Sequence, residues 1–177
     1  MRFAIALATI TIILSFKIAD DASRLGQAVA QRFLERGDSI PPDTSPITRD
    51  ALKAWAVNPG NAAAIHGYIY RILPWDVAFL VCLGCFLGLG SASLAPYANW
   101  PKWLSQSPSW CFWVIPCLYM LADLTEDAMI ARMLSSPSAI EQPSFDFMRL
   151  VTQLKKATAG ISIGQLLLVF ASGFAPK

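Results

Sequence analysis

Four long apolar runs, separated by polar or proline-containing segments, dominate the pattern of the chain. They cover about residues 3–19, 74–95, 110–134 and 147–174. A helix needs roughly 20 predominantly apolar residues to cross a hydrocarbon core of about 30 Å. Strand-like alternation of apolar and polar positions does not persist beyond a few residues. The pattern therefore predicts an all-α integral membrane protein, a four-transmembrane-helix bundle that forms one domain over residues 1–177.

The first run resembles either a secretory signal or a membrane helix in length and hydropathy. A signal peptide closes on small residues at its cleavage site, whereas Phe16, Lys17 and Ile18 precede Ala19 here. A lysine three residues before the cut fits such a site poorly. The sequence therefore favours an uncleaved helix.

Residues 20–73 have the composition of a water-soluble segment. We expect them to lie outside the hydrocarbon and to form short amphipathic helices between the first and second spans. The pairs Ser45-Pro46 and Asn58-Pro59 are typical of an N-cap followed by proline in the first helical turn. The segment is therefore predicted to be a helical cap on one face of the membrane.

Composition supports the membrane prediction and excludes other classes. Hydrophobic residues make up 55% of the chain and charged residues 15%, against roughly 25% charged in soluble domains. The formal net charge of +2 is too small for the concentrated basic face that binds nucleic acid. We therefore expect membrane lipids, and not nucleic acid, as partners.

The basic residues indicate an orientation. With four spans, Arg2, Lys102 and Lys177 share one side, and the other eleven basic residues lie on or towards the opposite side. Cytoplasmic loops carry an excess of lysine and arginine, which is known as the positive-inside rule, so this distribution favours both termini outside the cytoplasm. Sidedness stays open, since the acids of residues 20–73 balance the bases there.

Three carboxylates stand close together in the third predicted span, at Asp123, Glu126 and Asp127. Helical geometry places all three on one face. Such groups are costly in hydrocarbon unless they face inward, are paired or are protonated. No basic residue lies three or four positions from Asp127 on this helix. The compensating charge must therefore come from another helix.

The third and fourth spans are expected to form an antiparallel hairpin whose middle is near Glu141. Positions equidistant from that middle share a membrane depth, so Asp127 is predicted to lie level with Lys155, and Glu126 with Lys156. This pairing of opposite charges suggests an intramembrane cluster of the two acids with one or both lysines.

The same geometry places Asp123 about one turn deeper, without a basic partner at its level, where it could be protonated. Two interpretations of the cluster remain open. It could fix the register of the hairpin, or line a polar cavity for a proton, cation, lipid headgroup or partner helix, with Asp123 as the preferred functional residue. A hydrated cavity would favour the second interpretation, whereas a cluster sealed by Met120, Met129 and Met133 would favour the first.

The string Ala122–Ala128, followed by a turn and then by Thr152, Lys155 and Lys156, carries a resemblance. It is similar to small bacterial four-helix membrane proteins of unassigned function, with Asp-x-x-Glu-Asn in the third span and lysine in the fourth. Asp127 stands where those proteins usually have asparagine, which adds one charge. The likeness covers the second half of the chain and implies a four-helix fold with a polar core in the bacterial cytoplasmic (inner) membrane, but no activity.

Two glycine pairs have the spacing that lets neighbouring helices approach closely. Gly84 and Gly88 belong to the second predicted span, and Gly160 and Gly164 to the fourth. Both faces are therefore candidates for contact with other membrane protein subunits.

Catalytic and cofactor motifs are weakly represented. Cys82-Leu-Gly-Cys85 is formally a C-x-x-C, but it lies mid-span, whereas redox exchange requires access and a partner pair. His66 is the only histidine, and no Gly-x-Ser-x-Gly motif accompanies it. A group of three carboxylates and two lysines is more typical of a neutralised charge cluster than of a metal site. We therefore expect no cofactor and no metal site, and the catalytic residues, if any, are unknown.

Two classes of function follow. The first is a non-enzymatic membrane component, such as an accessory, assembly or scaffold subunit, which the glycine-spaced faces and the lack of a nucleophile favour. The second is a small transporter or lipid-active membrane enzyme that uses Asp123 and Glu126 for proton handling. The sequence favours the first class and leaves enzymatic activity undecided.

Overall fold

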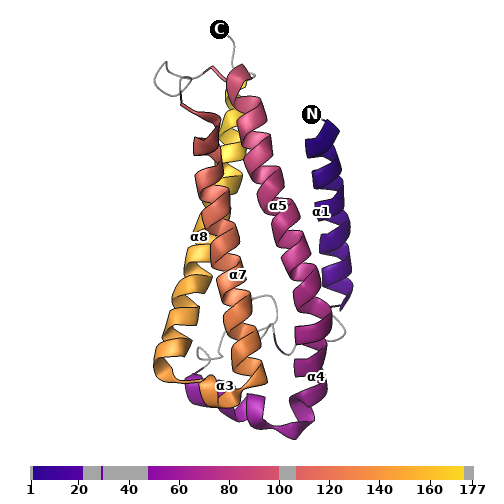
Figure 1. The fold of residues 1–177 in the computed structure, drawn as a ribbon, viewed down its shortest axis with the longest axis vertical. Helices are drawn as coiled ribbons and strands as arrows, with labels where there is room; N and C mark the ends of the chain where they lie inside the picture. Colours follow the sequence, from indigo (N-terminus) through magenta and orange to yellow (C-terminus); the bar gives the residue numbers. More distant parts are fainter. Residues whose placement is uncertain (1, 22–28, 30–47, 100–106, 174–177) are drawn as a thin grey trace, which may run out of the picture.

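The computed structural model describes residues 2–21, 29, 48–99 and 107–173. Every element in these ranges is helical, and the long helices run side by side along the molecule (Figure 1). The long helices are α1 (Arg2–Asp21), α5 (Leu73–Leu94), α7 (Val114–Ser135) and α8 (Gln142–Gly173). The all-α class predicted from the sequence is thus confirmed.

Helices α5, α7 and α8 pack against one another, and the contact between α7 and α8 is the most extensive in the chain. Helix α1 packs mainly along α5, on the outside of this group (Figure 1). Its outward side carries Ile12, Ile13 and Phe16, all exposed. An outer helix with apolar side chains on its free side is suited to lipid contact.

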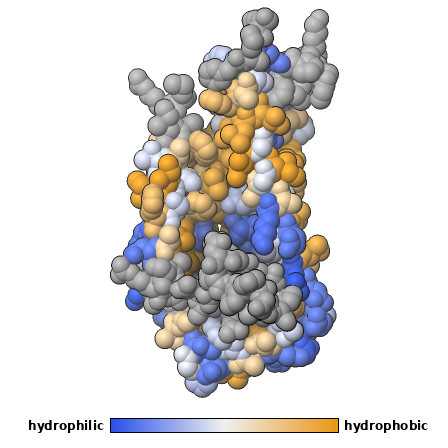
Figure 2. All heavy atoms as spheres, turned by 180° about the vertical axis from the view of Figure 1, so that it is seen from behind, coloured by the Kyte–Doolittle hydropathy of each residue, from blue (hydrophilic) through white to orange (hydrophobic). Residues whose placement is uncertain are grey.

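Two continuous helical stretches, Pro59–Tyr97 and Gln142–Gly173, are long and apolar enough to cross a membrane. Hydrophobic residues gather over the upper half of the molecule in Figure 2, whereas hydrophilic residues gather over the lower half. The lower half contains α3 (Arg49–Val57) and α4 (Ala62–Gly67) (Figure 1). On the face seen in Figure 2, apolar residues are thus more frequent toward one end of the long axis and polar residues toward the other.

The N-cap prediction is confirmed at Asn58, whose side chain accepts a hydrogen bond of 2.9 Å from the Gly60 N–H. Ser45, the other predicted cap, lies outside the described residues. Helix α3 instead begins after Thr48, whose hydroxyl accepts a backbone N–H from the first turn. Each cap satisfies an N–H that has no partner inside its own helix.

Helix α4 is joined to the second predicted span without a break. It continues through a π-helical turn, Tyr68–Ile72, directly into α5. Pro74 lacks an N–H and its ring crowds the preceding turn, which the wider π turn accommodates. The short helices expected before the second span are thus present as α3 and α4, and the stretch from Pro59 onward is continuous with the membrane-length helix.

A hydrophobic core at the α3 end of the molecule holds the α7–α8 hairpin closed. Ile140, in the turn between α7 and α8, is only 1% exposed. The turn is also held by Ser144, whose hydroxyl donates to the Ala139 carbonyl over 2.8 Å. The core residues come from α3, from the π turn, from the hairpin turn and the two arms next to it, and from residue 29. They are Val29, Leu52, Ala56, Tyr68, Ile72, Ile130, Met133, Leu134, Ile140, Phe145 and Met148.

The two glycine pairs differ in their surroundings. A Cβ at Gly88 would lie 2.5 Å from the Trp113 ring, and a Cβ at Gly84 would overlap the Met120 side chain. This pair is therefore already packed within the chain. A Cβ at Gly160 would meet no described atom within 4 Å, and the same holds at Gly164.

Gly88→Ala should lower the free energy of unfolding by about 1–3 kcal/mol, because the new methyl group would overlap a rigid ring. The matched variant Gly160→Ala should be neutral, or stabilising by up to about 1 kcal/mol, because only helix propensity changes there. Thermal unfolding in mild detergent measures both. Equal effects of the two variants would contradict the packing described here.

Candidate functional site

Helix α7 directs its three acids into the molecule. Asp123 is 4% exposed, Glu126 0% and Asp127 3%, whereas Leu121 and Leu124 on the same helix are exposed. The spacing of three and four residues places the acids on one face, as the sequence predicts. All three carboxylates are therefore removed from solvent.

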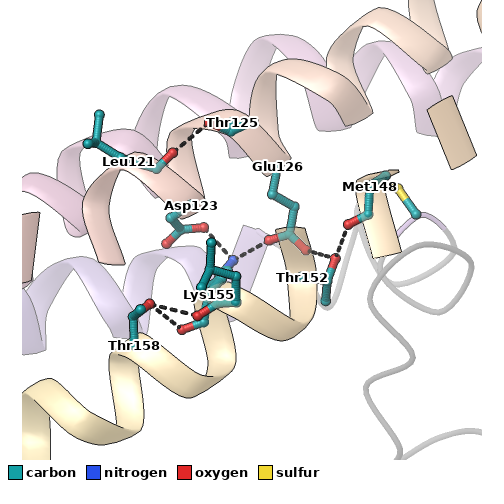
Figure 3. Close-up of polar contacts among 9 residues, drawn as sticks. Leu121, Asp123, Thr125, Glu126, Met148, Thr152, Lys155 and Thr158 are labelled. Atoms are coloured by element: carbon teal, nitrogen blue, oxygen red, sulfur yellow. Dashed lines mark hydrogen bonds and ion pairs between the residues drawn. The ribbon is translucent and has the colours of Figure 1, made fainter. Parts of the chain in front are cut away.

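Lys155 of α8 lies between two of these acids (Figure 3). Its Nζ donates a hydrogen bond of 2.6 Å to Glu126 Oε2 and forms an ion pair with Asp123. The other oxygen of Glu126, Oε1, accepts a hydrogen bond of 2.5 Å from the Thr152 hydroxyl. Both oxygens of the fully buried Glu126 carboxylate are therefore satisfied by α8. Hydrogen bonds to an ionised group of this kind are roughly twice as strong as neutral ones.

The ion pair predicted between Glu126 and a lysine of the fourth span is present, but the partners of Lys155 differ from those predicted. Lys155 pairs with Asp123 and Glu126, and not with Asp127, so Asp123 has the basic partner that the sequence argument denied it. The midpoint between Lys155 and its two acids falls near the buried Ile140 instead of the exposed Glu141. If the centre of a hairpin moves by one residue, the residue of one helix that lies level with a given residue of the other helix changes by two positions. The centre that these contacts indicate therefore coincides with a core residue of the turn.

Lys156 lies outside the cluster. It is exposed, whereas Lys155 is partly buried. Successive residues of an α-helix point about 100° apart, so only one of two adjacent lysines can face α7. Of the two lysines, Lys155 is therefore the one that joins the cluster, an outcome that the prediction of one or both lysines included.

Asp127 differs from its two neighbours. Its Oδ2 is buried and has no hydrogen-bond partner among the residues that the structure describes. The charged groups that act on it are Asp76, Asp123, Lys155 and Glu126. Asp76 comes from the first turn of α5, so the electrostatic surroundings of Asp127 include an acid of a third helix that the sequence analysis did not connect with the cluster. The sequence did contain a signal for Asp76, because a single carboxylate at the start of an apolar run is unusual.

Tyr119 also joins the cluster, one turn before Asp123 on the same helix. It is buried, and its hydroxyl interacts with Asp123. A phenol can donate a hydrogen bond to a carboxylate without adding a second cation. Tyr119 was missed because an aromatic residue in an apolar span is read as packing.

The cluster does not open into the groove seen elsewhere in the chain. That groove, of about 530 Å³, runs between α8 and the 3-10 turn Ser109–Trp113, and it is lined by Ser107, Cys111, Phe112, Ile161, Gly164, Gln165, Leu168 and Val169. The Gln165 side chain donates to the Phe112 carbonyl over 2.8 Å at its edge. The groove shares no residue with the acid–lysine cluster.

Comparison with protein-family models, with curated proteins and with solved structures found no match for this chain. The site is therefore interpreted from its own geometry. Within the described residues, no three His, Cys, Asp or Glu side chains are arranged to hold a metal ion. The arrangement can hold two helices together by charge and can exchange protons at its carboxylates.

Lys155→Met should lower the free energy of unfolding by about 3–5 kcal/mol, because it leaves Asp123 and Glu126 buried without a counter-charge. Lys156→Met, one residue away and exposed, should change it by no more than about 0.5 kcal/mol. Denaturant titration in mild detergent, followed by tryptophan fluorescence, compares the two. A similar loss in both variants would contradict the assignment of the ion pair to Lys155.

Thr152→Val should cost about 1.5–3 kcal/mol of folding free energy, because one oxygen of the buried Glu126 carboxylate loses its donor. Thr158→Val is a matched control on the same helix. Its hydroxyl donates only to the Leu154 and Lys155 carbonyls of its own helix, so we expect a cost of at most about 1 kcal/mol. Thermal unfolding of the two valine variants, side by side, tests the role of the Thr152 hydroxyl.

Proposed function

We propose that the chain is a non-enzymatic subunit of a membrane protein assembly, with an accessory, assembly or scaffold role. The observation that carries this proposal is the direction of the charged groups. Lys155 satisfies Asp123 and Glu126 inside the α7–α8 interface, so these side chains are used to hold two helices together. A transporter or lipid-active enzyme would need at least one of them presented to a substrate.

The proposal includes a four-span topology in a bacterial inner membrane. Helix α1 has 20 residues and α7 has 22, which correspond to about 30 and 33 Å at the usual rise per residue. Helix α7 carries more charge than an isolated span tolerates. Its buried acids, however, are partly neutralised by α8, which lowers the cost of placing α7 in lipid. The likeness of the third and fourth spans to small bacterial four-helix proteins favours the same arrangement.

The partner is proposed to dock on the α8 face that contains Gly160 and Gly164. This face supports close approach of a second helix, because both positions lack a side chain and a Cβ at either would meet no described atom within 4 Å. Ile161 and Leu168, which flank it, are exposed and apolar. Gly84 and Gly88 are excluded from this role, since Met120 and Trp113 already cover them.

The proposal is tested by purifying the tagged chain from its native membrane in mild detergent and measuring the stoichiometry of any co-purifying membrane protein. We expect one partner in fixed ratio. A Gly160→Leu/Gly164→Leu double variant should reduce its recovery at least tenfold, because two bulky side chains would separate the helices.

Ile163→Leu is the control, since Ile163 is exposed on the same helix and the substitution conserves its volume. It should leave recovery unchanged. A folded double variant that retains the partner would reject this docking face. Absence of any stoichiometric protein, combined with retained polar lipid at the acid cluster, would favour the transporter or enzyme class instead.

A further inference from the structure

The free side of α8 carries a line of apolar residues with a seven-residue repeat. They are separated alternately by three and four positions, which is the spacing at which two helices of a coiled coil meet. The large side chains among them are each half or more exposed. The α8 seam, as we call this line, consists of Phe147, Leu150, Leu154, Ala157, Ile161, Gly164, Leu168 and Ala171. The described part of the chain therefore leaves most of a helix-pairing surface uncovered.

The residues along the α8 seam alternate in size. A large side chain stands at the first position of every repeat, and a small residue stands at the fourth position of the last three, at Ala157, Gly164 and Ala171. Small residues at this spacing allow two helix backbones to approach, and the large side chains between them pack as knobs into holes. In a parallel pair of identical helices, each layer meets its own copy. The seam is therefore complementary to a second copy of itself.

Lipid chains cannot cover the whole seam. It is about 36 Å long at the helical rise per residue, whereas the hydrocarbon core of a bilayer is about 30 Å thick. Its beginning is bordered by Asp146 and Arg149, both exposed. Charged side chains of this kind belong in water or among headgroups, because hydrocarbon excludes them. The end of the seam at Phe147 and Leu150 therefore lies where protein, and not hydrocarbon, can remove it from water.

A second α8 has the geometry that a partner needs. The partner must be a helix longer than the bilayer core, with one apolar line that continues beyond it. Helix α8 has 32 residues, or about 48 Å, and two copies inserted in the same direction place equal heights side by side. Arg149 and Lys156 lie about 130° around the helix from the middle of the seam, so a two-fold axis there does not bring like charges together.

The groove beside α8 is a second, independent feature of this surface. Ile161, Gly164 and Leu168 belong both to the seam and to the lining of the groove of about 530 Å³, whose other wall includes Cys111 and Phe112. The chain's own described side chains leave this hollow unfilled. A helix that packs on the seam would cover the groove along the side that these three residues form.

We propose that two copies of the chain form a parallel dimer in which the α8 seam of one copy packs against the α8 seam of the other. This inference rests on the docking face proposed above and identifies its occupant as a second copy. Lys155 and Thr152 bind the acids of α7 from another side of α8. The ion-pair cluster therefore fixes the rotation of α8 that presents the seam outward.

The dimer is tested by disulfide cross-linking in the native membrane, with the four native cysteines replaced by alanine. Ala157→Cys and Ala171→Cys should each form a covalent dimer on mild oxidation, because small residues at these positions bring the two Cβ atoms near the separation that a disulfide requires. Ile163→Cys and Phe170→Cys are matched controls. Both positions are exposed on α8 but face about 130° away from the seam, so we expect at least tenfold less dimer.

The direction of the two helices has its own control. A mixture of Leu150→Cys and Leu168→Cys chains should give no cross-link between the two variants, because these positions are about 27 Å apart in height in a parallel pair. In an antiparallel pair they would lie level. A cross-link between these two variants would therefore overturn the parallel arrangement.

Native mass spectrometry of the chain with its cysteines intact gives a second measurement. We expect two copies per particle. Ala157→Phe should reduce the dimer fraction at least tenfold at equal concentration, because the ring would hold the two backbones apart. Ile163→Phe, on the other side of the exposed surface of α8, should leave the dimer fraction unchanged.

Three outcomes would overturn the dimer. These are a monomeric particle, equal cross-linking at Ala157 and at Ile163, and a product in which Ala157→Cys is joined to a different protein. The last result would reject the second copy and leave the proposed docking face and subunit role standing. A monomer without any stoichiometric partner would reject the subunit role as well.

Discussion

Among the residues that the structure describes, the ammonium group of Lys155 is the basic group shown in contact with the buried acids of α7, and the packing of α7 against α8 depends on it. Without that charge, Asp123 and Glu126 would be two acids inside an apolar interface, and each would favour separation of the helices. With the Lys155 ammonium group present, the same two acids form directional contacts. These contacts favour one rotation and one height of α8 relative to α7. Thr152 strengthens this specificity, because it occupies the remaining oxygen of Glu126.

Apolar packing determines where this charge can act. The core around Ile140 closes the hairpin at one end. Farther along the molecule, Gly88 lets α5 lie against Trp113. The two kinds of packing bring α5, α7 and α8 close enough for Asp76, Asp127 and Lys155 to influence one another across three helices.

The sequence was informative about elements and less so about register. Apolar runs identified all four long helices, and the spacing of Asp123, Glu126 and Asp127 predicted their common inward face. The partners of Lys155 were predicted in part: Glu126 was correct, whereas Asp123, which was expected to lack a basic partner, contacts Lys155. Asp76 and Tyr119 were missed for a related reason. Their contribution depends on how helices rotate relative to one another, which a one-dimensional pattern of hydropathy does not contain.

The π-helical turn Tyr68–Ile72 has a consequence for α5 as a whole. A π turn holds one more residue than an α turn, so it changes the angular phase between the residues before it and those after it. The side of α5 that carries Asp76 is therefore determined by a segment that precedes the apolar run. Insertion or deletion of a single residue there would rotate the helix by about 100° and change the side on which Asp76 lies, with the composition of the membrane-length segment almost unchanged.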